Sequence, residues 1–265
     1  RTNGEDMKTH QIELLAPAGD IESFYLAIKH GADAVYLAGK AFGARSSAQN
    51  FTIEEIQECV EYAHIFDKKV YVTINTLLFD DEFIVLESYV KRLSQIGVDA
   101  VIVQDFGVLE FLSKCFVGLE IHASTQMNVH TVAQAQVLKD MGVSRIVLAR
   151  EVDISLAKEI QERVGIEVEV FAHGALCVSY SGNCLMSSFI GKRSGNRGKC
   201  AQPCRLPYRL TSQTETKHHI STKDLMTLEE LETILRNNVV SLKIEGRLKR
   251  KEYVAQVTKS YRKML

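Results

Sequence analysis

Short, β-rich apolar runs alternate with amphipathic segments along most of the chain, and this alternation constrains the fold more than any other feature. Val, Ile, Leu and Ala dominate the runs, as expected for strands that are buried on both faces. The runs are Ile12–Leu15, Ala34–Leu37, Val70–Ile74, Ala100–Val103, Leu119–Ile121, Arg145–Leu148, Val168–Phe171 and Val239–Ile244. Strands separated by single helices indicate an α/β protein with a parallel sheet.

The segments between these runs have the period of helices. In Ile53–Phe66 the apolar residues share one face, and Thr52-x-x-Glu55 forms a capping box at its start. A similar box, Thr227-x-x-Glu230, lies near the start of the last helix expected before the eighth strand. The other expected helices are Ile21–His30, Asp81–Gln95, Val108–Cys115, Val129–Met141, Ile154–Val164 and Leu225–Arg236.

Glycine marks three helix ends in the same way. Gly31, Gly97 and Gly142 each come two or three residues before an expected strand, as in the short connections of a parallel sheet. Eight strand–helix units in about 250 residues predict a (β/α)8 TIM-type barrel. A doubly wound open sheet is the alternative, but the first turn reads Ala16-Pro17-Ala18-Gly19-Asp20 and lacks G-x-G-x-x-G.

One interval breaks this rhythm. More than sixty residues separate Phe171 from Val239, where a loop and one helix would suffice. We therefore expect a single barrel domain over residues 7–265, with a cysteine-rich insertion at about 173–220. We expect residues 1–6 to be an added or disordered segment. The polar N-terminus, and the lack of any run of 18 apolar residues, favour a cytoplasmic protein without a membrane span.

Four of the six cysteines lie in this insertion, spaced Cys-x6-Cys-x15-Cys-x3-Cys. Zinc ribbons use Cys-x2-Cys knuckles, which are missing here, whereas uneven spacing on a loop is compatible with an iron–sulfur cluster. Ordinary buried thiols or disulfides are the alternative. Cys59 and Cys115 stand alone on expected helices and are interpreted as core or surface thiols.

The near-zero net charge of −1 conceals a basic segment, because no acidic residue occurs between Glu169 and Glu215. The basic side chains there are candidate RNA contacts: Lys192, Arg193, Arg197, Lys199 and Arg205. A solvated loop that balances the charge of a cluster explains them equally well.

Polar residues follow several of the expected strands. In a barrel, the carboxyl ends of the strands build the active site, so these residues are candidates for a substrate pocket. They are Asn75, His122, Gln126, Arg150, His173, Glu245 and Arg247. No catalytic residue is assigned from the sequence.

Several motifs carry a family resemblance. They are Glu169-Val-Phe-Ala-His-Gly-Ala-Leu-Cys177, Ser181-Gly-Asn-Cys184, Asn196-Arg-Gly-Lys-Cys200-Ala-Gln-Pro-Cys204-Arg205, Glu13-Leu-Leu-Ala-Pro-Ala-Gly19, Ser221-Thr-Lys-Asp-Leu225 and Lys243-Ile-Glu-Gly-Arg247. Through them the chain resembles the collagenase-like peptidase family of unassigned catalytic type, over nearly its whole length. Family members are generally longer and continue past the barrel, so the chain resembles their N-terminal barrel portion.

The resemblance implies two kinds of activity. The family is named for peptidases, but several members support hydroxylation of a tRNA wobble uridine, of a ribosomal RNA cytidine or of a ubiquinone precursor. In those members four cysteines hold an iron–sulfur cluster, which implies Cys177, Cys184, Cys200 and Cys204 here. The expected cofactor is a 4Fe–4S cluster, which aerobic purification can remove or replace by zinc, and the expected partners are RNA and an electron donor.

A peptidase would need an activated nucleophile or a metal-bound water. The sequence has no H-E-x-x-H or G-x-S-x-G motif. A His173–Cys177 pair would use one of the four clustered thiols and leave three unexplained. We therefore favour hydroxylation of an RNA base, with tRNA wobble uridine to 5-hydroxyuridine as the specific reaction and a peptidase or quinone-precursor hydroxylation as alternatives.

Overall fold

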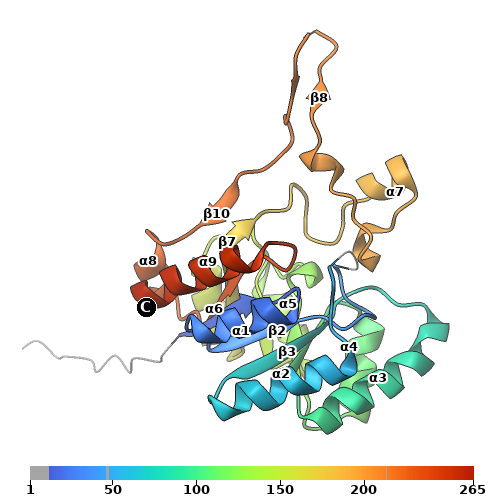
Figure 1. Cartoon of the computed structure of the whole chain (residues 1–265), viewed down its shortest axis with the longest axis vertical. Helices are drawn as coiled ribbons and strands as arrows, with labels where there is room; N and C mark the ends of the chain where they lie inside the picture. The colour runs from blue at the N-terminus through green and yellow to red at the C-terminus, as the bar shows by residue number, and fades with distance from the viewer. Residues whose placement is uncertain (1–11, 46–47, 213) are drawn as a thin grey trace, which may run out of the picture.

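The computed structural model describes residues 12–45, 48–212 and 214–265, and its centre is a closed parallel barrel (Figure 1). The strands are β1 (Glu13–Pro17), β2 (Ala34–Leu37), β3 (Lys69–Ile74), β4 (Ala100–Val103), β5 (Glu120–Ala123), β6 (Arg145–Val147), β7 (Glu167–Ala175) and β11 (Ser241–Ile244). Each pairs in parallel with the next, and β11 pairs with β1 to close the ring. The predicted (β/α)8 barrel is confirmed.

Helices follow these strands and cover the outside of the barrel. They are α1 (Ile21–Lys29), α2 (Ile53–Ile65), α3 (Phe83–Ile96), α4 (Phe106–Cys115), α5 (Val132–Asp140), α6 (Ser155–Val164) and α9 (Lys251–Met264). Thr52 and Glu55 form the predicted capping box at the start of α2. Gly31, Gly97 and Gly142 all have positive φ, as expected where a helix turns directly into a strand.

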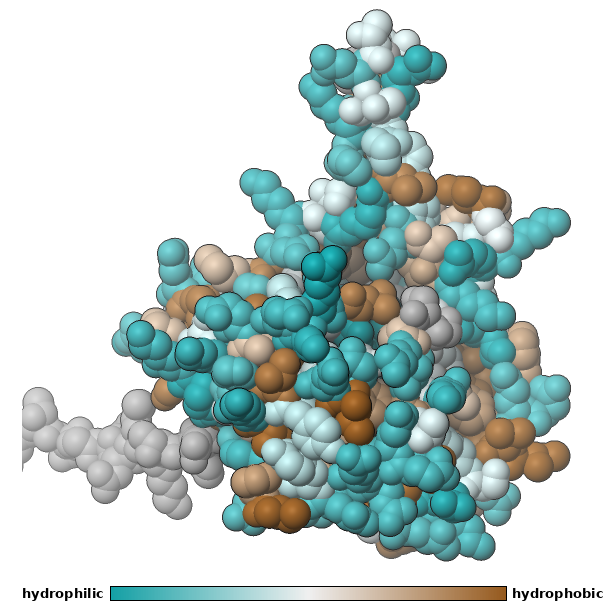
Figure 2. Space-filling view, in the orientation of Figure 1, coloured by the Kyte–Doolittle hydropathy of each residue, from teal (hydrophilic) through white to brown (hydrophobic). Residues whose placement is uncertain are grey.

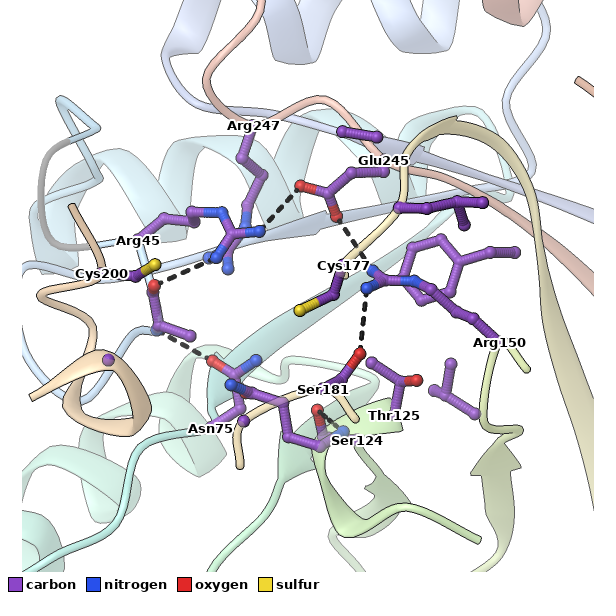
Figure 3. Close-up of a pocket in the computed structure, with 18 of the residues that line it drawn as sticks. Arg45, Asn75, Ser124, Thr125, Arg150, Cys177, Ser181, Cys200, Glu245 and Arg247 are labelled. Atoms are coloured by element: carbon purple, nitrogen blue, oxygen red, sulfur yellow. Dashed lines mark hydrogen bonds and ion pairs between the residues drawn. The ribbon is translucent and has the colours of Figure 1, made fainter. Parts of the chain in front are cut away.

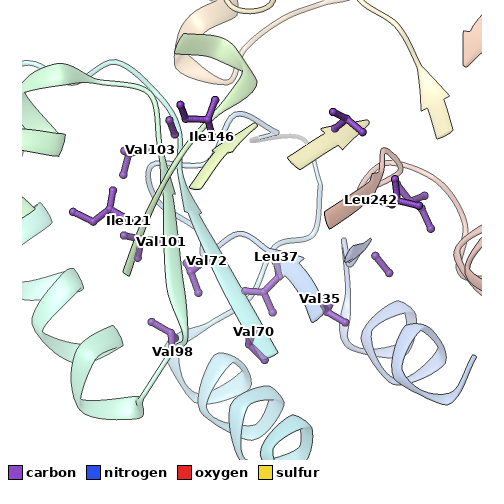
Figure 4. Packing of buried hydrophobic residues seen from close by; sticks show 14 of the residues in the cluster. Val35, Leu37, Val70, Val72, Val98, Val101, Val103, Ile121, Ile146 and Leu242 are labelled. Atoms are coloured by element: carbon purple, nitrogen blue, oxygen red, sulfur yellow. The ribbon is translucent and has the colours of Figure 1, made fainter. Parts of the chain in front are cut away.

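The main hydrophobic core lies between the barrel and these helices. Val35 and Leu37 of β2, and Val70 and Val72 of β3, point outward into it, as Figure 4 shows. Because side chains alternate along a strand, the residues between them face the barrel interior. Tyr36 and Tyr71 do so, together with Ile102 of β4.

The interior near the amino ends of the strands is filled by an ionic network, the floor cluster of Glu13, Arg145, Glu169 and Lys243. Arg145 Nη1 lies 2.5 Å from Glu13 Oε1, and Lys243 Nζ lies 2.8 Å from Glu169 Oε1. Arg145 also reaches Glu169 at 3.4 Å and, through Nε, the half-exposed Glu167 at 2.8 Å. The buried charges of the floor cluster therefore balance, which is what burial of ions requires.

The insertion between β7 and β11 consists of short elements joined by loops. They are α7 (Met186–Gly191), two 3-10 turns at Gly195–Arg197 and Pro203–Arg205, β8 (Tyr208–Arg209), β9 (Thr216–Lys217), β10 (Asp224–Met226) and α8 (Leu231–Arg236). The β8–β9 hairpin projects away from the barrel (Figure 1).

The prediction of one helix over Leu225–Arg236 is wrong in its first half. Asp224–Met226 instead forms β10, which pairs antiparallel with His173–Ala175 and extends β7. The expected second capping box is also wrong, because the Thr227 hydroxyl donates to the carbonyl of Ala172 and helix α8 starts only at Leu231.

The surface in the view of Figure 2 is mainly hydrophilic, with apolar residues in small separate groups. Over the described ranges, none of the helices combines the length and the apolar character that a membrane span needs.

Candidate functional site

A pocket opens at the carboxyl ends of the strands, between the barrel and the insertion. Its walls come from both, as Figure 3 shows. From the barrel come Tyr36, Asn75, Arg150, Phe171 and Arg247, and from the insertion Ser181 and the cysteines. The position agrees with the general location of active sites in this type of barrel.

All four cysteines of the insertion line this one pocket: Cys177, Cys184, Cys200 and Cys204. All are free thiols, as are Cys59 and Cys115, which lie outside the pocket. The pKa of Cys204 is raised, first by burial and then by the other three thiols, while Arg205 opposes the shift. What the four thiols share is their position in the wall of one pocket.

Backbone amides donate to two of these sulfurs. The amide of Met186 lies 3.4 Å from Cys184 Sγ, and the amide of Gln202 lies 3.4 Å from Cys200 Sγ. The Ser187 hydroxyl also donates to Cys200 Sγ at 3.8 Å. Hydrogen bonds to the ligating sulfurs are one of the factors that set the potential of an iron–sulfur centre.

Four thiols are the donor set that an iron–sulfur cluster uses. Across the part of the chain that the structure describes, no three His, Cys, Asp or Glu side chains are close enough together to hold one ion. In a four-iron cluster each thiolate binds its own iron, so the sulfurs stand further apart than around one zinc. Cys177, Cys184, Cys200 and Cys204 are the residues that would hold it.

Ionic and polar contacts fasten the insertion to the barrel. Arg197 forms a two-pronged contact with Glu82 at 2.9 Å for both nitrogens, and its guanidinium lies over the ring of Phe79. Gln104 donates to the carbonyl of Asn196 at 2.8 Å. The pKa of Glu82 is lowered to about 2, mainly by its hydrogen bonds from Arg197.

Arg205 links separate segments of the insertion through hydrogen bonds. Its guanidinium donates to the Ser221 hydroxyl at 2.8 Å, to the carbonyl of Leu176 at 2.6 Å and to that of Thr222 at 2.5 Å. The predicted RNA contacts therefore divide into two kinds. Arg197 and Arg205 are partly buried and held by protein groups, whereas Lys192, Arg193 and Lys199 are exposed, with Arg193 Nε donating to the carbonyl of Lys199 at 3.0 Å.

Charged residues of the barrel form a second ionic group at the pocket, the mouth cluster of Arg45, Arg150, Glu245 and Arg247 (Figure 3). Glu245 lies 3.3 Å from Arg45 and 3.8 Å from Arg150. Burial opposes the charge of Glu245, but the arginines outweigh burial and lower its pKa. Burial likewise lowers the pKa of Arg150 and Arg247, although a guanidinium remains charged at any physiological pH.

Glycines allow the segment that carries Glu245 and Arg247 to pack closely. A Cβ on Gly19 would lie 2.0 Å from the carbonyl oxygen of Arg247, and one on Gly174 would lie 2.6 Å from that of Glu245. Gly174 also has a φ of +107°. Gly19, after β1, and Gly174, in β7, thus let the backbone that carries Glu245 and Arg247 approach closely, which a residue with a Cβ would prevent.

Five of the seven predicted pocket residues line the pocket, and two do not. Asn75, Gln126, Arg150, Glu245 and Arg247 are in its wall. His122 is instead fully buried in the barrel interior, beside the ring of Tyr71 and in register with Arg145 at the start of β6. The stagger of the barrel strands puts it near the floor cluster, and burial lowers its pKa.

His173 lies inside β7 rather than after it, because β10 lengthens that strand. Its ring packs against Tyr253 and Tyr261 of α9, and its Nδ1 is 3.5 Å from the Tyr261 hydroxyl. Cys177 lines the pocket and His173 does not, so the structure does not bring the two together there.

Sequence reasoning missed Arg45, Ser181 and the aromatic walls Tyr36 and Phe171. Arg45 lies in the long segment between β2 and α2, where Gly39 and Gly43 precede it. A glycine-containing loop after a barrel strand is a signal that could have identified it.

Residues 19–265 of the chain match the sequence model of peptidase family U32. It is 44% identical to the 23S rRNA 5-hydroxycytidine C2501 synthase of Escherichia coli over 264 residues, and 39% identical to the tRNA hydroxylation protein P1 of Bacillus subtilis over 274 residues. These alignments cover 98% and 99% of the chain, but only 40% and 65% of the two relatives.

The solved structure of a U32 peptidase has the same fold, with a TM-score of 0.61 and 16% identity, over 92% of this chain and 94% of that one. The family match extends over more than nine-tenths of the sequence and includes the strands that build the mouth cluster and the insertion that bears the four thiols. The chain therefore belongs to peptidase family U32.

Proposed function

We propose that the chain is the barrel portion of an iron–sulfur protein that supports hydroxylation of an RNA base, specifically tRNA wobble uridine to 5-hydroxyuridine. The observation that carries the proposal is the convergence of four loop thiols on the pocket at the barrel mouth. The relatives named for hydroxylation of ribosomal and transfer RNA support the choice of substrate. Such a protein would act in the cytoplasm.

The reaction converts a C–H bond of the base into C–OH by insertion of one oxygen atom. The oxygen-atom donor comes from outside the chain and is reduced by the two electrons that the base loses. The cluster, when bound, supplies one-electron redox chemistry or a site that positions the substrate.

The chain's own residues then have defined tasks. Asn75 and Gln126 offer amide groups for the edges of a base, and Phe171 and Tyr36 offer apolar walls. The exposed Lys192, Arg193 and Lys199 lie on the insertion above this mouth, where they would contact phosphates. The amides of Met186 and Gln202 hydrogen-bond the sulfurs of Cys184 and Cys200 and would orient them toward a cluster.

The peptidase alternative rests on the family name and on the related solved structure. The nucleophile and base considered for it are not brought together, because His173 packs against α9 while Cys177 lines the pocket. A quinone-precursor substrate would have no use for the three exposed basic residues.

Anaerobic purification tests the cofactor. Iron and sulfide analysis and the visible spectrum are compared for the wild type, Cys184→Ser and the matched control Cys115→Ser, which alters an exposed thiol outside the pocket. We expect wild type and control to hold iron and sulfide, and Cys184→Ser to lose most of both. A colourless, iron-free wild type that cleaves peptides would overturn the proposal.

The substrate is tested in cells that lack the gene. The nucleosides of tRNA and ribosomal RNA are compared with and without the complete gene, and with the gene carrying Cys200→Ser. We expect 5-hydroxyuridine in tRNA to disappear and to return only with the unaltered gene. Unchanged hydroxyuridine together with a lost hydroxycytidine would move the substrate to ribosomal RNA.

A further inference from the structure

The mouth cluster carries more positive charge than its own carboxylate can neutralise. Glu245 contacts two guanidinium groups, those of Arg45 at 3.3 Å and Arg150 at 3.8 Å, and Arg247 adds a third positive charge nearby. Charge-assisted hydrogen bonds between a guanidinium and a carboxylate are usually about 2.7–2.9 Å long. Glu245 therefore holds Arg45 and Arg150 loosely.

Buried hydrogen-bonding atoms at this site also lack partners. Arg150 Nε and Arg247 Nε are buried donors, and Gln126 Oε1 is a buried acceptor, with no hydrogen bond to any described residue. Arg247 is only 6% exposed and uses its Nη1 on the Thr73 hydroxyl at 3.0 Å. An unsatisfied buried donor is costly, so the protein leaves the hydrogen-bonding capacity of these guanidinium groups incompletely used.

The guanidinium groups are held in place before any ligand arrives. Arg150 lies 4.0 Å from the centre of the Phe171 ring, and Arg247 lies 5.7 Å from that of Tyr36. Ser181 accepts a hydrogen bond from Arg150 at 3.1 Å. Preorganised donors lose little entropy on binding, which is a property of ligand sites.

The thiolates of a cluster would bring negative charge close to these arginines. Sulfur is a weak hydrogen-bond acceptor, however, and it does not match the planar fork of a guanidinium as two oxygens do. Thiolates would therefore match these arginines in charge alone, whereas an oxyanion matches them in charge and in hydrogen-bonding geometry.

We propose that Arg45, Arg150 and Arg247 form a subsite for an oxyanion, the carboxylate or phosphate group of a small ligand that enters the barrel mouth beneath the cysteines. Tyr36 and Phe171 flank the same space and would contact the uncharged part of the ligand. The subsite stands independently of the proposed RNA hydroxylation, because it is argued from the arginines alone.

Calorimetric titration of the whole chain with malonate, inorganic phosphate and uridine 5′-monophosphate tests the subsite. We expect malonate or phosphate to bind the wild type, and the neutral analogue malonamide not to bind. Arg150→Gln and Arg45→Gln should each weaken anion binding by about tenfold, since each removes one charged hydrogen bond. The matched control Arg163→Gln, on the outer surface of α6, should bind like the wild type.

The pattern of anions identifies the source of the oxyanion. Tighter binding of malonate indicates an organic acid, and tighter binding of phosphate and uridine monophosphate indicates a nucleotide. Should Arg150→Gln fail to fold, Arg45→Gln decides, because the Arg45 side chain is 29% exposed and tolerates replacement. A wild type that binds no anion, or variants that bind like the control, would overturn the proposal.

A last comparison separates this subsite from the cluster. Cys184→Ser should lose iron and still bind the anion with unchanged affinity, whereas Arg45→Gln should bind the anion about tenfold more weakly and keep its iron. If anion binding disappears together with the iron in Cys184→Ser, the arginines alone do not form the subsite.

Discussion

The barrel holds one ionic cluster at each end, and the two differ in charge balance and in contact length. In the floor cluster two cations meet two buried carboxylates, at distances as short as 2.5 and 2.8 Å. In the mouth cluster one carboxylate accompanies three cations and contacts two of them, at 3.3 and 3.8 Å. The charges of the floor cluster are balanced by protein groups, whereas the mouth cluster keeps an excess of positive charge.

This difference follows from the positions of the clusters in the fold. The floor cluster is centred on Glu13 and Arg145, the first residues of β1 and β6, and of its four members only Lys243 also lines the pocket. The mouth cluster lies under the insertion, at the end of the barrel where ligands bind. We interpret the fully paired floor cluster as a stabilising element of the barrel. We interpret the incompletely paired mouth cluster as part of a functional site.

The largest effect is expected from Glu169→Gln in the floor cluster. The change removes the carboxylate that Lys243 contacts and leaves a buried ammonium group without a counter-charge. We expect the free energy of unfolding to fall by about 3–5 kcal/mol. Urea denaturation at pH 7 measures the loss, with Glu159→Gln in an exposed pair on α6 as the control, for which about 0.5 kcal/mol or less is expected.

The same pair of proteins tests the electrostatic origin of that loss. Burial would raise the pKa of Glu169, but Lys243 and Arg145 outweigh it and lower the pKa to about 2 in the folded protein. A lowered pKa means that the stabilisation is present above the ordinary carboxyl pKa and is lost as pH falls toward 2. The difference between wild type and Glu169→Gln should therefore shrink between about pH 4.5 and 2. A constant difference would assign the loss to packing instead.

A smaller effect is expected from Glu245→Gln in the mouth cluster. The contacts that it removes are long, and the arginines keep access to the pocket, so we expect a loss of about 1–2 kcal/mol. Malonate should restore part of the melting temperature of this variant and none of that of Glu169→Gln. A loss as large as that of Glu169→Gln, unaffected by malonate, would mean that both clusters are equally complete.

Much of the fold could be predicted because its signals are local. The capping box at Thr52 and the glycines after three helices act within a few residues, so sequence alone locates those helix ends. The helix expected at Leu225 was wrong for the opposite reason. Asp224–Met226 becomes a strand only because β7, some fifty residues earlier, offers an edge to pair with.

The site could be predicted only in part, and the limits are equally physical. The four cysteines stand out because they crowd one insertion that breaks the strand–helix rhythm. His122 was misplaced because the level of a residue inside a barrel depends on strand stagger, which leaves no local signal. Arg45 was missed because the sequence of a long loop does not indicate which of its side chains points into the pocket at the barrel mouth.

The smallest effect is expected from Ser181→Ala, which tests whether the barrel or the insertion holds the mouth cluster in place. The change removes one hydrogen bond to Arg150, but Phe171 still supports the guanidinium, and Asn128 still donates to the Ser181 carbonyl at 2.9 Å. We expect about 0.5–1 kcal/mol of lost stability in urea and malonate binding within about twofold of the wild type, with the exposed Ser88→Ala of α3 as the control. A loss of malonate binding would show that the insertion positions Arg150, because the barrel contacts are unchanged in this variant.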